Sequence, residues 1–461
     1  MKNYRFEEDT LGKVKIPVDA LWGPQTERSR HNFTAGPLMP LTVIKTLLNI
    51  KKAVALTNYE LNDLDKNKAN LIVEAVDSLL ELSDEHLQKY FPLHVYQTGS
   101  GTQTNMNVNE VIVHEAAKIN DHILLSPNDD VNRSQSTNDI FPTAMNIAAF
   151  LAIKKLSKVI MKLIDLFDKK QKQYWKIVKI GRTHLQDATP LTFGQEISGW
   201  KDTLKHDYHF LMELATTLLE LPLGGTAVGT GLNTPVGFTT VVQKYLGEIY
   251  DIDFKLNTNK FYGLTSHAGL NIVHGALKTL ASDLLKIAND VRFLASGPRS
   301  GYGELNIPAN EPGSSIMPGK INPTQAEALT MAAVRVMGND TTITIAASQG
   351  NFEMNVYKPV IIASFLESVS LLKETLIGFT NKMIAGLTIN EERMKQLVND
   401  SLMTVTSLSP HIGYHASAKI AQLAERKNLT LREAALESGK VNAKQFDEWV
   451  DPLKMTNIDN N

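Results

Sequence analysis

The chain of 461 residues contains no cysteine, and it has no excess of either charge, with 47 Lys and Arg against 49 Asp and Glu. The missing cysteine excludes disulfides, thiolate metal sites, iron–sulfur clusters and cysteine nucleophiles. The balanced charge gives no basic face and argues against nucleic acid as a partner. No apolar run is long enough to cross a bilayer, and residues 1–9 are acidic rather than signal-like. We therefore expect a cytoplasmic enzyme with no membrane partner.

Helical periodicity dominates what the sequence does contain. One series of apolar residues is spaced by alternating steps of three and four, which predicts a long helix packing against nearly parallel or antiparallel partners. Its members are Leu270, Val273, Leu277, Leu280, Leu284, Ile287, Val291 and Leu294. Similar spacing predicts a second long helix over residues 143–174, and further helices are expected near 194–220 and 359–381.

Another helix is expected to start at Pro323, because Asn322 is a good N-cap residue and Gln325 completes a capping-box pattern. Together these helices predict a central bundle. Short amphipathic segments at 391–399, 416–427 and 431–438 predict a small helical tail.

From these patterns we expect three domains. Residues 1–135 form an N-terminal, mostly helical domain with polar segments, in which helical stretches alternate with Gly/Pro-rich turns. Residues 136–390 form the central bundle of long helices and include a loop at 297–322. Residues 391–461 form the small C-terminal helical domain.

The helix of residues 270–294 carries apolar residues away from its main seam. These are Ile272, Ala276, Leu285 and Phe293. Such a helix either lies at the centre of its own chain's core or is shared with neighbouring subunits. The patterning favours the second alternative.

Four polar blocks interrupt the helical pattern, at residues 97–105, 127–139, 181–187 and 313–323. A single block of this kind is typical of turns and helix caps. Four of them at helix ends indicate a functional site. The last block lies in the irregular loop 297–322, and loops of this length inside compact domains are usually functional.

The block 313–323 combines two adjacent hydroxyls, Ser314 and Ser315, with Lys320 and a helix-starting Asn-Pro pair. A hydroxyl that acts as a base needs nearby positive charge and backbone N–H donors to hold its alkoxide form. This block offers both.

Three other features favour structural interpretations. His411 and His415 have the spacing of a metal pair, but no glutamate accompanies them, so we predict no metal. The glycine-rich run at 224–231 lacks the Lys-Ser/Thr of a phosphate loop and predicts tight turns. The lysines between positions 169 and 179 are expected to form a solvated helix face.

Taken together, the polar blocks resemble those of the fumarase/aspartase superfamily and, within it, the class II fumarate hydratases, over nearly the whole chain. The sequence Gly-Ser-Ser-Ile-Met-Pro-Gly-Lys-Ile-Asn-Pro at 313–323 is similar to the superfamily signature, and residues 181–187 and 99–103 are similar to the fumarase versions. Aspartases typically have glutamine at the position of His184 and alanine at that of Gly319. These two differences favour a hydratase over an ammonia lyase.

The resemblance implies an all-α fold of three domains, with a central five-helix bundle that forms a twenty-helix core in a homotetramer. It also implies active sites built from three subunits. The implied reaction is the reversible hydration of fumarate, a small C4 dicarboxylate, to (S)-malate in the tricarboxylic acid cycle. This cofactor-free acid/base elimination passes through an aci-carboxylate intermediate. The alternatives are an aspartate ammonia-lyase and a catalytically silent structural homologue.

The resemblance also assigns roles. Ser314 is the base that removes the proton from carbon, and His184, oriented by Glu327, handles the proton of the departing hydroxyl. In this family the acid/base assignment was first given to the His–Glu pair and later to the serine. Residues that match substrate-binding positions are Ser100, Gly101, Thr102, Ser136, Thr137, Asn138, Thr183, Ser315, Lys320, Ile321 and Asn322.

Many class II fumarases have an accessory dicarboxylate site with an arginine and a histidine. Here those positions are Ile123 and Ser126, while Asn128 and Asp129 remain. The loss of two cationic groups argues against a second anion site.

Overall fold

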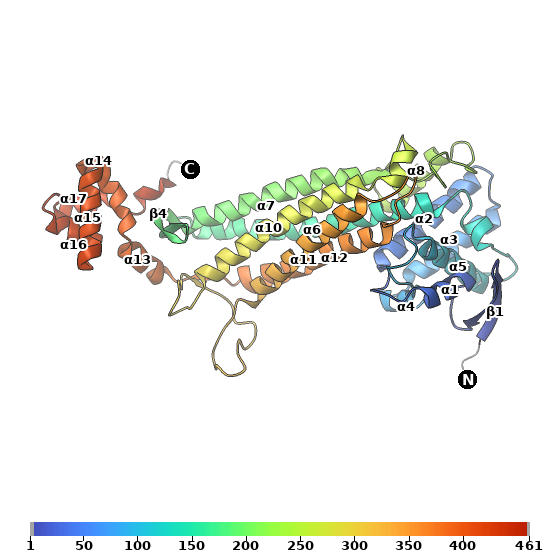
Figure 1. Ribbon diagram of the computed structural model, residues 1–461, viewed down its shortest axis with the longest axis horizontal. Helices are drawn as coiled ribbons and strands as arrows, with labels where there is room; N and C mark the ends of the chain where they lie inside the picture. The colour runs from blue at the N-terminus through green and yellow to red at the C-terminus, as the bar shows by residue number, and fades with distance from the viewer. Residues whose placement is uncertain (1–3, 459–461) are drawn as a thin grey trace. The chain divides into compact units, whose positions relative to one another are not determined.

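The computed structural model describes residues 4–458 and is mainly helical, which confirms the predicted all-α class (Figure 1). The longer helices are α1 (Pro24–Asn32), α2 (Leu41–Glu60), α3 (Lys66–Glu81), α5 (Thr102–Ile119), α6 (Thr137–Gln173), α7 (Phe193–Ala215), α8 (Phe238–Tyr250), α10 (Ala268–Leu294), α11 (Thr324–Ala347), α12 (Lys358–Gly378), α13 (Glu391–Asp400) and α15 (Tyr414–Lys427). The shorter ones are α4 (Asp84–Gln88), α9 (Lys260–Thr265), α14 (Ser409–Ile412), α16 (Leu431–Glu437) and α17 (Ala443–Trp449). Short 3-10 or π-helices lie at Pro127–Val131, Thr216–Leu219, Phe379–Ile384, Leu402–Leu408 and Lys454–Thr456.

The strands form four two-stranded sheets. Three are antiparallel and pair β1 (Tyr4–Asp9) with β2 (Gly12–Pro17), β3 (Val178–Thr183) with β4 (Gln186–Thr192), and β7 (Leu305–Asn306) with β8 (Thr388–Ile389). The fourth is parallel and pairs β5 (Glu220–Leu221) with β6 (Lys255–Leu256). The sequence analysis did not predict these strands.

The chain divides into two compact units. Unit 1 comprises the residues up to Ser157 together with Phe210–Thr279 and Val334–Leu371. Unit 2 comprises Lys158–His209, Leu280–Ala333 and the residues from Leu372 onward.

Helix α10 confirms the long helix predicted from its seam, since all eight seam residues are buried. In unit 2, the Trp200 indole of α7 donates to Asp290 of α10 at 3.0 Å. In unit 1, His274 of α10 lies 2.9 Å from the Asp340 carboxylate of α11. The helices predicted near 194–220 and 359–381 are confirmed as α7 and α12.

Two helix starts differ from prediction. Helix α6 begins at Thr137 rather than 143, because Ser136 caps it: its hydroxyl accepts from the Asn138 N–H at 3.2 Å. Helix α11 begins at Thr324, and the Pro323 carbonyl accepts its first N–H bonds. The Asn322 side chain is not its cap, since its amide donates instead to the Gly313 carbonyl at 2.6 Å.

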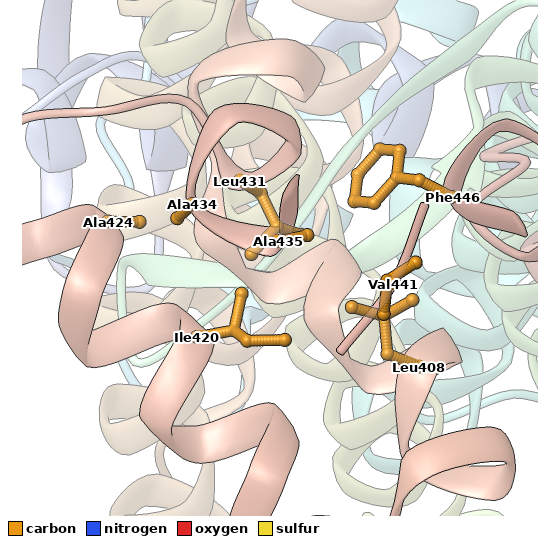
Figure 2. Close-up of a cluster of buried hydrophobic side chains, with 8 residues drawn as sticks. All are labelled: Leu408, Ile420, Ala424, Leu431, Ala434, Ala435, Val441 and Phe446. Atoms are coloured by element: carbon orange, nitrogen blue, oxygen red, sulfur yellow. The ribbon is translucent and has the colours of Figure 1, made fainter. Parts of the chain in front are cut away.

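The C-terminal segments form the predicted short helices, here α13, α15 and α16. A cluster of eight buried apolar side chains joins α15 and α16 to the neighbouring segments (Figure 2), namely Leu408, Ile420, Ala424, Leu431, Ala434, Ala435, Val441 and Phe446. Capping boxes at Thr430 and Asn442 start α16 and α17.

The predicted solvated face of lysines is wrong at two positions. Lys170 is buried and donates to the Leu387 carbonyl at 2.6 Å, and Lys179 is buried against the Glu196 carboxylate at 2.8 Å. The glycine-rich run at 224–231 does form turns. None of the helices within residues 4–458 has the length and apolar character to span a bilayer.

His267, just before α10, makes the stability of the fold sensitive to acid. Its side chain is 4% exposed, and burial, with a smaller contribution from the Lys358 ammonium, lowers its pKa to about 3. The unfolded chain therefore binds the proton first. The stabilisation from neutral His267 is complete above an unfolded pKa of about 6.5 and is lost as the pH falls, by about 2 kcal/mol at pH 5.

We expect the urea concentration at half-unfolding to be lower at pH 5 than at pH 7.5. In His267→Gln this decrease should be smaller. His122→Gln is the matched control, because the His122 side chain is 93% exposed. All measurements use one protein concentration, because the apparent stability of an oligomer depends on it. An equal pH dependence in wild type and His267→Gln would contradict this account.

Candidate active site

The 313–323 segment of unit 2 is an irregular loop closed by its own backbone. The Gly313 N–H donates to the Lys320 carbonyl at 2.8 Å, and the Asn322 side-chain amide donates to the Gly313 carbonyl. Inside this closure, the Ser314 hydroxyl oxygen accepts from the N–H groups of Ile316 at 3.2 Å and Met317 at 3.0 Å. Two donors aimed at one hydroxyl oxygen are the arrangement that stabilises an alkoxide.

Two cavities flank this loop. A cleft of about 490 Å³ is lined by Ser314 and Lys320 together with residues 309–313. A cavity of about 950 Å³ is lined by Lys320, Asn322 and Glu327, and also by Arg292 of α10. Lys320 thus faces both spaces, and the N-terminus of α11 opens beside it, where helix dipole and charge favour an anion.

His184 lies at the tip of the β3–β4 hairpin in unit 2. The two turn residues, His184 and Leu185, have positive φ values of 57° and 60°, as a two-residue hairpin turn requires. Thr183 ends β3, and the tip is exposed. Within the described part of one chain, His184 forms no ion pair with Glu327.

In unit 1, the predicted substrate-binding hydroxyls lie at two helix N-termini. Ser100 and Thr102 share a hydrogen bond of 2.9 Å at the start of α5. Gly101 between them has φ 86°, and a Cβ there would lie 2.4 Å from the Phe141 ring. Asn105 of α5 donates to the Thr137 hydroxyl at 3.1 Å, which connects the two blocks.

Lys51 of α2 lies behind these blocks and was not predicted from the sequence. Its ammonium is buried and donates to Asn132 at 3.0 Å and Gln135 at 2.7 Å. Burial lowers the pKa of Lys51 to about 7, although the carboxylate of Asp139 opposes that shift. The available signal was that Lys51 shares a helix face with Leu47, Leu48 and Val54.

Asp139, also missed, fastens the Ser136–Asn138 block to the glycine-rich run. One carboxylate oxygen accepts from the Ser136 N–H at 3.0 Å, and the other accepts from the N–H groups of Gly224 at 2.9 Å and Thr226 at 3.0 Å. Burial raises the pKa of Asp139, and these backbone donors oppose the increase. The turns of the glycine-rich run therefore help to shape this block.

Two residues of the possible accessory site, Ser126 and Asp129, are hydrogen-bonded to each other. The Ser126 hydroxyl donates to Asp129 at 2.9 Å and caps the short helix that follows. Two cations of unit 1 are paired with carboxylates, Lys68 with Asp130 and Arg133 with Asp63.

The predicted site residues thus fall into two groups. Ser100, Gly101, Thr102, Ser136, Thr137 and Asn138 belong to unit 1, whereas Thr183, His184, Ser314, Ser315, Lys320, Ile321, Asn322 and Glu327 belong to unit 2. Residues 4–458 contain no group of three His, Asp or Glu side chains arranged to hold a metal ion. In the His411–His415 pair, the His411 ring has a packing role, because it stacks on the Trp449 ring with 4.1 Å between the ring centres.

Long packed helices and a loop that combines a hydroxyl with a lysine at a helix start fit a helical lyase, and family models match the chain. A model described as "Lyase" matches residues 12–338, and one described as "Fumarase C C-terminus" matches residues 405–457. The chain is 54% identical to a class II fumarate hydratase of Listeria monocytogenes, covering 98% of this chain and all of that one. It is 52% identical to that of Bacillus subtilis, covering 98% of each.

Solved structures give the same picture. A class II fumarase from Schistosoma mansoni superposes with a TM-score of 0.94 at 40% identity, over 98% of this chain and 99% of that one. A fumarate lyase:delta crystallin from Brucella melitensis, bound to cobalt, gives 0.94 at 37% identity, over 98% and 100%. The chain therefore belongs to the class II fumarate hydratase family of lyases. The resemblance inferred from the polar blocks is confirmed.

Proposed function

We propose that the protein catalyses the reversible hydration of fumarate to (S)-malate. The observation that carries this proposal is the Ser314 hydroxyl, which accepts two backbone N–H bonds in a cleft that it shares with Lys320. A hydroxyl held in this way is suited to abstract a proton from carbon.

In the dehydration direction, the Ser314 alkoxide removes a proton from the carbon beside one carboxylate of malate. The electron pair moves into that carboxylate and forms the aci-carboxylate. Lys320, Asn322 and the N-terminus of α11 stabilise its charge. The electron pair then returns to form the double bond, and hydroxide leaves with a proton supplied by His184, directly or through a water. The hydroxyls of unit 1, with Thr183 and Ser315, bind the carboxylates.

We also propose a homotetramer in which subunits share active sites. The support is apolar surface on the long helices of one chain: Ile272 and Phe293 of α10 are 50% and 51% exposed, and Met331 of α11 is 68% exposed. Sedimentation equilibrium at four times the chain mass is the expected result. The division at residues 135 and 390 and a cytoplasmic location are part of the same proposal.

The function is tested by following fumarate absorbance with malate and with aspartate in parallel. We expect turnover of malate alone. Turnover of aspartate alone would identify an ammonia lyase, and turnover of neither would indicate a silent homologue.

We expect malate turnover to be unchanged after dialysis against a chelator, since the proposed chemistry uses only side chains and a helix N-terminus. The assay compares chelated enzyme with enzyme supplied with Mg²⁺. Activity that disappears on chelation and returns with the metal would contradict the metal-independent mechanism.

A further inference from the structure

A buried charge cluster lies at the stem of the β3–β4 hairpin, and the reaction outlined above does not use it. The Glu304 carboxylate is fully buried, and the Arg182 guanidinium donates to it at 2.6 Å. The Lys179 ammonium lies 3.3 Å from the second Glu304 oxygen and 2.8 Å from Glu196. Two cations and two carboxylates thus balance within one cluster.

Glu304 is held rigidly by its own backbone. Its N–H donates to the Leu294 carbonyl at the end of α10, and its carbonyl accepts from the Asn390 N–H, both at 2.8 Å. The next two residues form β7 and pair with β8. The base of the loop 297–322 is therefore an anchor, even though the segment around Ser314 lies near the surface.

Arg182 is held from a second side by the same loop. Its guanidinium lies 4.5 Å from the centre of the Tyr302 ring, a cation–π distance. Tyr302 is itself fixed, because its carbonyl accepts from Arg393 of α13 at 3.0 Å. Both partners of Arg182, Glu304 and Tyr302, thus belong to the same fixed segment of the loop 297–322.

The hairpin has an irregular stem just where Arg182 lies. The pairing register of β3 and β4 shifts between Ile180 and Arg182, and His184 follows Arg182 by two residues. A register shift leaves local pairing weaker, so the direction of the tip depends on contacts outside the ladder. The ion pair with Glu304 is such a contact.

We propose that Arg182 and Glu304 form a positioning pair that fixes the direction of the hairpin tip, and with it Thr183 and His184. This inference rests on the proposed function, in which His184 supplies a proton to the departing hydroxyl. Neither residue is catalytic, since they act through the hairpin.

Glu304→Gln preserves the shape of the side chain and removes its charge. The cluster then holds two cations against one carboxylate, and the ion pair of Arg182 is replaced by a weaker hydrogen bond to a neutral amide. A displacement of about 1 Å at a reacting group can cost about a hundredfold in rate. We expect kcat for malate to fall at least about tenfold, with KM within about twofold.

Hydrogen exchange supplies a readout that does not depend on catalysis. In Glu304→Gln, the amides of residues 182–187 should exchange at least about tenfold faster, while those of α15 should stay unchanged. Arg182→Met should behave alike, and the double variant should lose no more than either single one, since both remove the same bond. Glu304→Asp should recover part of kcat.

Glu110→Gln is the matched control. Glu110 is also a buried carboxylate, and it accepts backbone N–H bonds from Gly23, Gln25 and Thr26. This variant should lose stability while keeping kcat and the hairpin exchange of the wild type. Unchanged exchange at 182–187 in Glu304→Gln would overturn the proposal, as would faster exchange with an unchanged kcat in active enzyme. If wild type does not convert malate, the proposed function fails, and exchange alone decides whether the pair holds the hairpin.

Discussion

Replacing Ser314 with alanine should lower kcat for malate dehydration by about a thousandfold, the range of a lost general base. The variant keeps the Ile316 and Met317 N–H groups but loses the oxygen that they stabilise. KM should change little, because Lys320 and the carboxylate-binding hydroxyls remain. Steady-state fumarate absorbance across a range of malate concentrations gives both constants.

His184→Asn separates the two possible bases. If Ser314 is the base, His184→Asn should impair the departure of hydroxide while proton exchange at carbon, followed with deuterated solvent, continues. Ser314→Ala should abolish that exchange. Full turnover by a folded Ser314→Ala, with exchange lost only in His184→Asn, would assign the base to His184 instead. Far-UV circular dichroism and sedimentation confirm that each variant folds and assembles.

The long helices could be predicted from the sequence because their determinants are local. The alternating spacing of three and four along α10 places every seam residue on one face, and that face is buried. The loop around Ser314 could be predicted for a similar reason, since glycine and proline exclude regular structure there.

The buried charges could not be predicted, because their partners are distant in sequence. Arg182 and Glu304 are 122 residues apart, and Asp139 and Gly224 are 85 apart. A lysine such as Lys179 reads as solvated until its carboxylate partners are known. Polar residues that position the candidate site are therefore the part that only the structure reveals.

The residues of the candidate site are also far apart in the sequence. One group lies at the N-termini of α5 and α6 in unit 1, and the other lies on the β3–β4 hairpin and the 313–323 loop in unit 2. The proposed sharing of sites between subunits gives the exposed apolar residues of α10 and α11 a role. Burying them would assemble the bundle and complete the site together.

Replacing Asp340 with alanine should lower the stability of unit 1 by about 3 kcal/mol, because it breaks a buried network across three helices. The Asp340 carboxylate of α11 lies 2.9 Å from His274 Nδ1 and accepts from Lys278 at 2.6 Å. The other nitrogen of His274 lies 2.9 Å from the Ser368 hydroxyl of α12. Both side chains of this His–Asp pair are buried.

The protonation states follow from the surroundings. Burial alone raises the pKa of Asp340, but hydrogen bonds from His274 and Lys278 lower it overall. Burial lowers the pKa of His274 despite the nearby carboxylate. A neutral His274 that donates from Nδ1 to an ionised Asp340 agrees with both pKa shifts. The contribution of Asp340 is present above its unfolded pKa of about 3.8 and is lost as the pH falls further.

The prediction is tested by the urea midpoint at neutral pH and fixed protein concentration. Arg335→Ala is the matched control on the same helix, because its ion pair with Glu367 is exposed, and such pairs contribute at most about 1 kcal/mol. Asp340→Ala strands a buried imidazole N–H, whereas Arg335→Ala leaves the Glu367 carboxylate exposed to water. Equal midpoint shifts for the two variants would show that the His274–Asp340–Ser368 network does not hold α10, α11 and α12 together.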